Sequence, residues 1–167
     1  MKNVMILTWA GQFGMAIARR MGCGLKIIIG DKNRSHAQET AKIMEQAGFD
    51  TVSLEIDISS RSSIQHMLRC AQSYGNITMF INAAGVSPSQ ASIETILNVD
   101  LYGTAVLLEE VGRVIAEGGV GVTISSQSGH RLPALTPEED EALAMTPTEE
   151  LLSLDILQPS HIRDTLH

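Results

Sequence analysis

Short apolar runs alternate along the chain with stretches in which apolar positions recur every three or four residues. Most runs are nearly continuous in hydrophobicity, which is typical of parallel strands covered on both faces. Five strands are predicted, over residues 4–7, 25–29, 51–56, 77–81 and 120–124. Strands and helices that alternate at this spacing favour right-handed βαβ units. The pattern therefore predicts an α/β, Rossmann-type doubly wound parallel sheet with strand order 3-2-1-4-5.

The stretches between these runs predict helices. The first is expected over residues 12–21, and the second begins with Ser35 and Gln38, which resemble a capping box. A long helix is expected from Ile93 to about Ala116, and its inner face is formed by Leu101, Ala105 and Leu108.

The chain changes character after Gly129. Thr136 and Thr146 each precede a proline and lie three residues before a glutamate, so two short helices with threonine caps are predicted. No sixth strand is predicted in this region. The strand at 120–124 would then be an open apolar edge.

A glycine-containing loop follows the first predicted strand. In the G-x-G-x-x-G register, Trp9, Gly11 and Gly14 fill the three glycine positions, so the first glycine is missing. The second glycine of such a loop lets a pyrophosphate approach the backbone, and the third allows tight packing of the helix on the strand. Gly11, Gln12, Phe13 and Gly14 are therefore candidate cofactor-binding residues. The alternative is an ordinary turn between a strand and a helix.

Acidic residues follow the second and third predicted strands. Asp31 lies 22 residues after Trp9, where an acid binds the adenosine ribose hydroxyls in dinucleotide-binding folds. An acid there also repels a 2′-phosphate and favours NAD over NADP, although the neighbouring Lys32 and Arg34 blur that preference. The alternative for Asp31 is a helix cap or a turn. The alternative for Asp57, which follows the third strand, is the cap of the next helix.

Several of these segments resemble the short-chain dehydrogenase/reductase family in order and spacing. They are Asp31, Asp57-Ile58-Ser59, Asn82-Ala83-Ala84-Gly85, Val99-Asp100-Leu101-Tyr102-Gly103-Thr104 and Ile124-Ser125-Ser126-Gln127-Ser128-Gly129. The resemblance implies a seven-stranded sheet, commonly in dimers or tetramers, that moves hydride between NAD(P) and an alcohol or carbonyl. It identifies residues 1–129 as an NAD-binding Rossmann domain, and residues 130–167 as a helical, lid-like excursion and tail of the same domain.

The resemblance also assigns roles by position. Asp31 would hold the ribose, Asp57 and Ile58 would flank the adenine, and the cofactor cleft would be lined by Asn82, Ala83, Ala84 and Gly85. Lys32 is a further candidate cofactor-binding residue. Ser126 matches the catalytic serine, whose hydroxyl can donate to an oxygen that gains negative charge. Asp100 replaces the asparagine that supports a proton-relay water. An ionised carboxylate could accept hydrogen bonds there but could not donate them.

The family's Tyr-x-x-x-Lys motif is absent. Its tyrosine is the general acid/base, and its lysine lowers the pKa of that tyrosine and holds the nicotinamide ribose. Tyr74 and Tyr102 are followed four residues later by Thr78 and Val106 instead. The chain is therefore expected to stop before strands six and seven and to be inactive alone. The alternative is a non-catalytic dinucleotide-binding or oligomerising module.

Composition and charge limit the kinds of partner that are expected. The chain has 167 residues, 44% of them hydrophobic, and a net charge of −7 with scattered basic residues, so a nucleic-acid partner is not expected. No apolar run reaches the roughly 18 residues of a membrane span. Cys23 and Cys70 lack metal-type spacing and are expected to be reduced, buried thiols of a cytoplasmic protein with no metal. The family resemblance implies a small-molecule alcohol or carbonyl substrate and a homo-oligomer.

Overall fold

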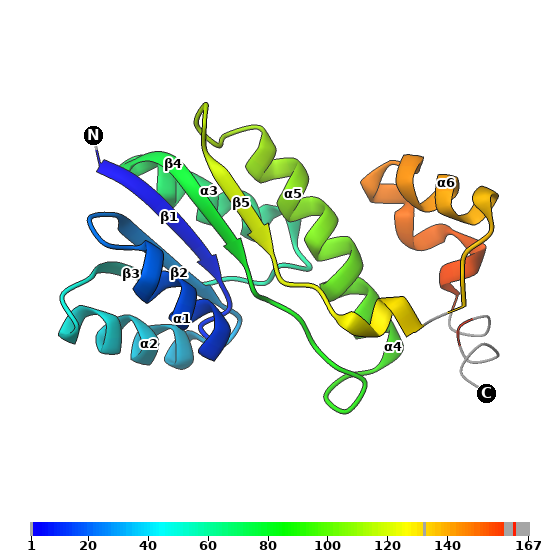
Figure 1. The fold of residues 1–167 in the computed structure, drawn as a ribbon, viewed down its shortest axis with the longest axis horizontal. Helices are drawn as coiled ribbons and strands as arrows, with labels where there is room; N and C mark the ends of the chain where they lie inside the picture. The colour runs from blue at the N-terminus through cyan, green and yellow to red at the C-terminus, as the bar shows by residue number, and fades with distance from the viewer. Residues whose placement is uncertain (1, 132, 159–161, 163–167) are drawn as a thin grey trace.

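Five parallel strands form one sheet in the order β3-β2-β1-β4-β5 (Figure 1), which confirms the predicted topology. The computed structural model describes residues 2–131, 133–158 and 162. The strands are β1 (Lys2–Thr8), β2 (Lys26–Asp31), β3 (Asp50–Glu55), β4 (Gly75–Asn82) and β5 (Val120–Thr123).

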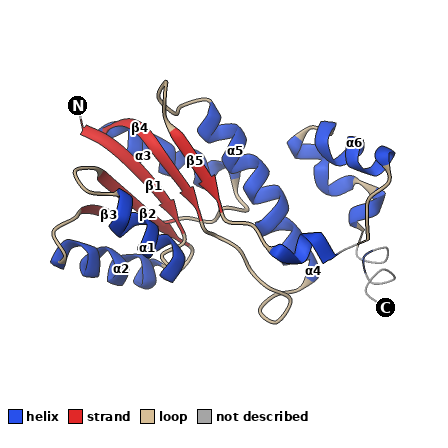
Figure 2. Ribbon diagram, in the orientation of Figure 1, coloured by secondary structure: helices blue, strands red, loops and turns tan. Residues whose placement is uncertain are grey.

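Helices cover both faces of the sheet (Figure 2). They are α1 (Gln12–Met21), α2 (Arg34–Gln46), α3 (Arg61–Tyr74), α4 (Ile93–Ile96), α5 (Thr104–Gly112) and α6 (Pro137–Met145). Leu7 and Ile29 pack with α1 and α2 on one face, whereas Ile6 and Phe80 pack with α3 and α5 on the other. Burial of both faces explains why the central strands are apolar almost throughout.

Helix α1 begins at Gln12, as predicted, and lies close to β1. A Cβ atom on Gly14 would lie 2.6 Å from Leu7 Cδ1 and 2.9 Å from the Trp9 carbonyl oxygen. Both distances are shorter than side chains tolerate, so only glycine allows this approach of helix and strand. The tight packing of helix on strand that was predicted for Gly14 is therefore present.

The start of α2 differs from the prediction. Its N-cap is Asn33, whose side-chain oxygen accepts from the His36 N–H at 3.1 Å. The capping box predicted at Ser35 and Gln38 is therefore wrong, because Asn33 offers a good acceptor two positions earlier. The corresponding prediction for α6 is confirmed, since Thr136 and Glu139 form a complete capping box.

The long helix predicted from Ile93 is interrupted. Residues Leu97–Gly103 form a π-helical segment, η1, between α4 and α5, and α5 ends at Gly112. A π turn holds more residues than an α turn, so the faces that follow it are rotated from the predicted pattern. Leu108, expected on the inner face, is 54% exposed, whereas Leu107 is fully buried. The single regular helix and its predicted inner face are wrong for this physical reason.

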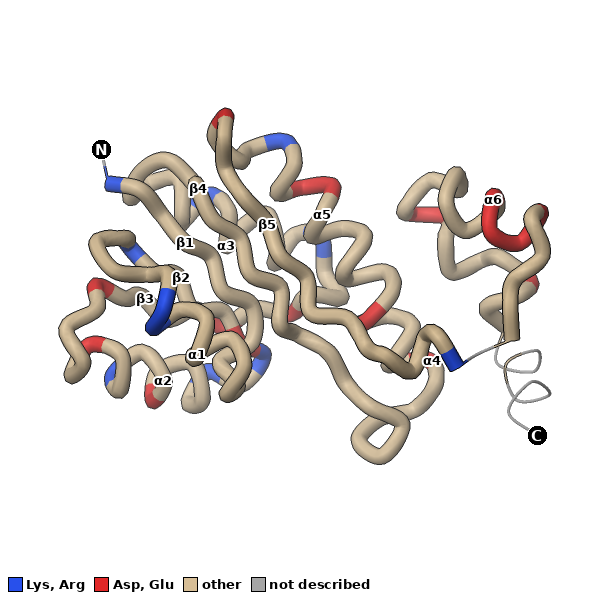
Figure 3. The backbone as a smooth tube through the Cα atoms, in the orientation of Figure 1, with Lys and Arg blue, Asp and Glu red and all other residues tan. Residues whose placement is uncertain are grey.

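The excursion after the sheet lies beside the α4–α5 end of the molecule (Figure 1). It contains the 3-10 segments η2 (Gln127–Arg131), η3 (Thr148–Ser153) and η4 (Asp155–Leu157), and α6 carries a cluster of acidic residues (Figure 3). The second threonine cap is wrong, because η3 begins after Pro147 with no side-chain cap. Residues 132, 159–161 and 163–167 of the predicted lid and tail lie outside the described residues.

Strand β5 is an edge of the sheet and is solvent-exposed along its length. Val120, Val122 and Ile124 are 53%, 48% and 42% exposed, which agrees with the predicted open apolar edge. Cys23 is exposed and Cys70 half-buried, so the expectation that both thiols are buried is wrong. None of the helices in the described part of the chain is long and apolar enough to cross a membrane.

Candidate functional site

A cavity of about 250 Å³ lies at the carboxyl ends of the strands. This is the edge at which open α/β sheets bind ligands. It brings together six of the residues selected from the sequence, which are Asp31, Lys32, Asp57, Ile58, Ala84 and Gly85. The volume is below the roughly 300–1,000 Å³ typical of complete small-molecule sites, so it suits one half of a dinucleotide.

Asp31 ends β2 at the wall of this cavity and is only 8% exposed. Its Oδ2 accepts from the Ala10 N–H at 3.2 Å and lies 2.8 Å from His36 Nδ1. Its Oδ1 accepts from the Asn33 N–H at 2.8 Å. The carboxylate therefore ties the loop after β1 to the start of α2. Of the two structural alternatives for Asp31, the turn role is therefore observed. The helix-cap role is not, because the N-cap of α2 is Asn33.

Trp9 adopts a strained backbone conformation beside Asp31. Its φ is +69°, in the left-handed region that costs a residue with a Cβ about 1–2 kcal/mol. The Trp9 N–H donates to the Gly30 carbonyl at 2.7 Å, which fixes the turn. The position of a Cβ on Gly11 lies 3.4 Å from Trp9 Nε1. The indole thus lies against the glycine backbone that a pyrophosphate would approach.

Asp57 faces the same cavity from the loop after β3. Lys32 Nζ lies 2.8 Å from Asp57 Oδ2, and Ser59 Oγ donates to Asp57 Oδ1 at 2.6 Å. Burial pushes the pKa of Asp57 upward, but the bonds from Lys32 and Ser59 outweigh it and hold the pKa below its ordinary value. The N-cap of α3 is Ser60, so the alternative cap role for Asp57 is wrong.

Asn82 ends β4 and is fully buried. Its Oδ1 accepts from Thr8 Oγ1 at 2.7 Å and from the Ala84 N–H at 3.2 Å, and its Nδ2 donates to Thr104 Oγ1 at 3.3 Å. The Ala83 N–H donates to the Thr8 carbonyl at 3.2 Å. These bonds hold the ends of β1 and β4 together and fix the backbone that carries Ala84 and Gly85.

Asp100 lies in the π-helical segment η1, behind the wall formed by Gly85. Its Oδ1 accepts from the Val86 N–H at 2.9 Å. Burial raises the pKa of Asp100, and the bond from Val86 offsets that effect only in part. The bond from Val86 ties the π-helical segment to the loop after β4.

Substitution Asp100→Asn is expected to raise the free energy of unfolding at pH 7, because it removes a partly desolvated charge and keeps the acceptor for Val86. An acid with a raised native pKa lowers stability as the pH rises through that pKa. The difference should therefore vanish below pH 3.8, the ordinary value. Urea unfolding at several pH values measures it. A variant no more stable than the wild type at pH 7 would contradict the prediction.

Other predicted site residues lie outside the cavity lining. Gly11, Gln12 and Gly14 belong to the loop and first turn of α1, and the Phe13 side chain is 77% exposed. Ser126 is exposed after β5, and its Oγ accepts from the Ser128 N–H at 3.1 Å. The structure therefore brings together the residues predicted around adenosine, and places Ser126 apart from them.

Some residues of the site were not predicted from the sequence. Val86 and Gln90 line the cavity and belong to none of the motifs, and Val99 lines it from a motif segment but was not itself selected. His36 contacts Asp31 from the first turn of α2. His36 could have been found from the sequence by assigning the helix cap to Asn33. The residue three positions after that cap is His36, which then lies in the first turn of the helix, next to Asp31.

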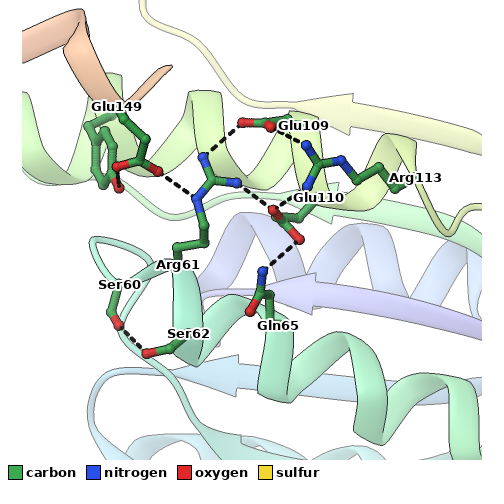
Figure 4. Close-up of polar contacts among 9 residues, drawn as sticks. Ser60, Arg61, Ser62, Gln65, Glu109, Glu110, Arg113 and Glu149 are labelled. Carbon is green, nitrogen blue, oxygen red and sulfur yellow. Dashed lines mark hydrogen bonds and ion pairs between the residues drawn. The ribbon is translucent and has the colours of Figure 1, made fainter. Parts of the chain in front are cut away.

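Arg61, at the start of α3, joins the loop after β3 to α5 and to the excursion (Figure 4). Its guanidinium bonds Glu110, lies 2.8 Å from Glu109 Oε2 and lies 2.6 Å from Glu149 Oε1. The Tyr102 hydroxyl donates to Glu149 Oε2 at 3.0 Å. Burial, followed by this bond, raises the pKa of Tyr102. Tyr102 is thus part of the anchor of η3.

A protein-family model described as enoyl-(acyl carrier protein) reductase matches residues 11–139. The chain is 35% identical over 158 residues to a short-chain dehydrogenase/reductase, bsc3, of Alternaria brassicicola, covering 94% of this chain and 58% of that protein. It is 23% identical over 143 residues to tropinone reductase-like 3 of Erythroxylum coca, covering 79% of this chain and 55% of that protein. The chain thus spans little more than half the length of these relatives.

A solved structure with the same fold is that of a short-chain dehydrogenase/reductase from Burkholderia phymatum in complex with NAD. Its TM-score is 0.69 at 21% identity, and the match covers 77% of this chain and 50% of that chain. At this identity the similarity establishes the fold. The five-stranded sheet of order 3-2-1-4-5 therefore corresponds to about half of the structure of that enzyme.

Proposed function

The chain belongs to the short-chain dehydrogenase/reductase family, and we propose that it binds NAD in the cavity at the carboxyl ends of its strands. The observation that carries this proposal is a buried carboxylate, Asp31, beside a cavity whose walls include Asp57 and Ile58. In dinucleotide-binding sheets an acid at this position bonds the hydroxyls of the adenosine ribose. Ile58 then contacts the adenine.

The remaining cofactor contacts follow the direction of the sheet edge. The pyrophosphate would lie at Gly11–Gly14, at the N-terminus of α1, where backbone N–H groups favour anions. The nicotinamide half would extend along Ala84 and Gly85 at the end of β4. Residues 1–129 form the NAD-binding unit in this proposal, and residues 130–167 form the lid-like part.

NAD is favoured over NADP in this proposal because of the charge at the ribose. The Asp31 carboxylate is 8% exposed, so its interaction with a second negative group is weakly screened. A 2′-phosphate would lie beside it and be repelled. Lys32 and Arg34 follow Asp31 in the chain and reduce this repulsion.

The reaction assigned to the family is hydride transfer between the nicotinamide and a small alcohol or carbonyl compound. Ser126 would donate a hydrogen bond to the substrate oxygen as it gains negative charge. Asp100 would accept from the proton-relay water. Neither Tyr74 nor Tyr102 is followed by lysine at the fourth position, so we propose that this chain binds NAD without turnover.

Two measurements test NAD binding and the proposed lack of turnover. They are calorimetric titration with NAD and an absorbance assay for NADH over a panel of alcohols. We expect saturable binding by the wild type, weaker binding by Asp31→Asn, and no NADH formation. Absence of binding to the wild type would overturn the cofactor proposal. Formation of NADH by the 167-residue chain would overturn the proposed lack of turnover.

A second function, self-association, is favoured by the exposed edge at β5. Val122 pairs with Ile81 in register, so both face the side of α1 and α2. Among the described residues no helix covers β5 on that side (Figure 1). Light scattering is expected to show a dimer of the wild type and a monomer of Val122→Lys. A monomeric wild type would remove this candidate.

A further inference from the structure

The side chain of His36 occupies part of the carboxylate that the proposed ribose site needs. His36 lies in the first turn of α2, three residues after the cap Asn33. Its Nδ1 lies 2.8 Å from Asp31 Oδ2. A carboxylate can only accept hydrogen bonds, so Nδ1 must carry the hydrogen. His36 therefore donates to the group that is assigned to the adenosine ribose.

The acceptor capacity of Asp31 is nearly filled. A carboxylate has about four acceptor positions, two on each oxygen. The Ala10 N–H and His36 use Oδ2, at 3.2 and 2.8 Å, and the Asn33 N–H uses Oδ1, at 2.8 Å. One position on Oδ1 remains, whereas a ribose with two hydroxyls needs two.

One of the present donors must leave when a ribose diol binds. The Ala10 and Asn33 donors are backbone groups, fixed by the loop after β1 and by the start of α2. The His36 side chain is 42% exposed and has solvent on one side. Rotation of His36 is therefore the change that opens a second acceptor position.

We propose that His36 sets the choice between NAD and NADP by sharing the carboxylate of Asp31. This inference rests on the proposed NAD site. In competition with the ribose hydroxyls, His36 weakens NAD binding. By screening the negative charge of Asp31, it also reduces the repulsion of a 2′-phosphate, and so it favours NADP. The two effects have opposite signs, and both depend on the same contact.

The test compares the wild type with His36→Ala, using His66→Ala as a matched control, because His66 is an exposed histidine on α3. The expected results for His36→Ala are NAD binding about three- to fivefold tighter, within the range of one hydrogen bond, and NADP binding weaker by a similar factor. The probe 2′-deoxyadenosine diphosphate has one hydroxyl, for which the free position on Oδ1 suffices. Its affinity should not change.

Calorimetry with these three ligands separates the outcomes. Unchanged or weaker NAD binding in His36→Ala overturns the inference and leaves the NAD site intact. Equal tightening of NAD and the 2′-deoxy probe also overturns it, because His36 would then act on the shape of the cavity rather than on the ribose. Absence of NAD binding in every variant overturns the proposed function together with this inference.

Discussion

Replacement of Trp9 by glycine is expected to tighten NAD binding about tenfold, which corresponds to about 1.4 kcal/mol. The indole lies over Gly11, with Trp9 Nε1 3.4 Å from the position of a Cβ on that glycine. In a dinucleotide-binding loop the pyrophosphate approaches through this space. The indole must therefore move before NAD can bind, and a glycine at position 9 removes that requirement.

The same substitution relieves backbone strain, but that effect belongs to folding. Trp9 has a φ of +69°, which is a property of the turn itself, so its strain is expected to affect the free energy of unfolding rather than NAD binding. Substitution Trp9→Ala removes the indole and keeps a Cβ in the left-handed region. The glycine variant is thus expected to have a free energy of unfolding about 1 kcal/mol higher than the alanine variant.

Titration calorimetry and urea unfolding on the wild type and both variants separate these effects. If NAD binding tightens equally in Trp9→Gly and Trp9→Ala, and the two variants differ in stability as expected, the results support crowding of the pyrophosphate by the indole. Tightening in the glycine variant alone would attribute the effect to the backbone. Unchanged affinity in both variants would show that the tryptophan is tolerated in the complex.

The strands and the acid at the end of β2 could be predicted from the sequence because both depend on local patterns, and the strand order followed from the alternation of strands and helices. Continuous apolar runs mark buried parallel strands wherever they occur. Asp31 is defined by its distance from the glycine loop, and the third-glycine role of Gly14 follows from the same spacing. The structure places Asp31 beside the cavity and Gly14 against Leu7, as these patterns require.

The details that escaped prediction depend on competition between alternatives of similar energy. Glu149 fits a capping box with Thr146, but in the folded chain it bonds Arg61 and Tyr102, which lie far away in sequence. Asn33 and Ser35 are both good helix caps. The π-helical segment around Asp100 interrupts a helix whose apolar pattern is regular, and no feature of the sequence indicates the interruption.

Substitution Arg61→Ala is expected to lower the free energy of unfolding by about 2 kcal/mol, because it removes a partner from a buried charge. Glu110 has a side chain only 7% exposed and bonds Arg61 directly. After the substitution it keeps Arg113 Nη1 at 2.9 Å and Gln65 Nε2 at 3.2 Å (Figure 4). These two bonds keep the loss below the 3–5 kcal/mol or so of a fully orphaned buried charge.

The matched control is Arg113→Ala, which removes an arginine that contacts two of the same glutamates. The Arg113 side chain is 59% exposed, so its loss is expected to cost about 0.5 kcal/mol or less. Urea unfolding measures both variants. Equal losses would show that exposure does not determine the contribution of each arginine and would contradict the expectation for Arg61.

The stability difference between the wild type and Arg61→Ala should depend on pH. The bond from Arg61 is the largest cause that lowers the pKa of Glu109 and of Glu149 below the ordinary value of 4.5. Acids with a lowered native pKa contribute their full stability above the ordinary value and lose it as the pH falls through the lowered one. The difference should therefore be constant from pH 7 down to about 5 and shrink below 4.5. A difference that grows on acidification would contradict ion pairing as its source.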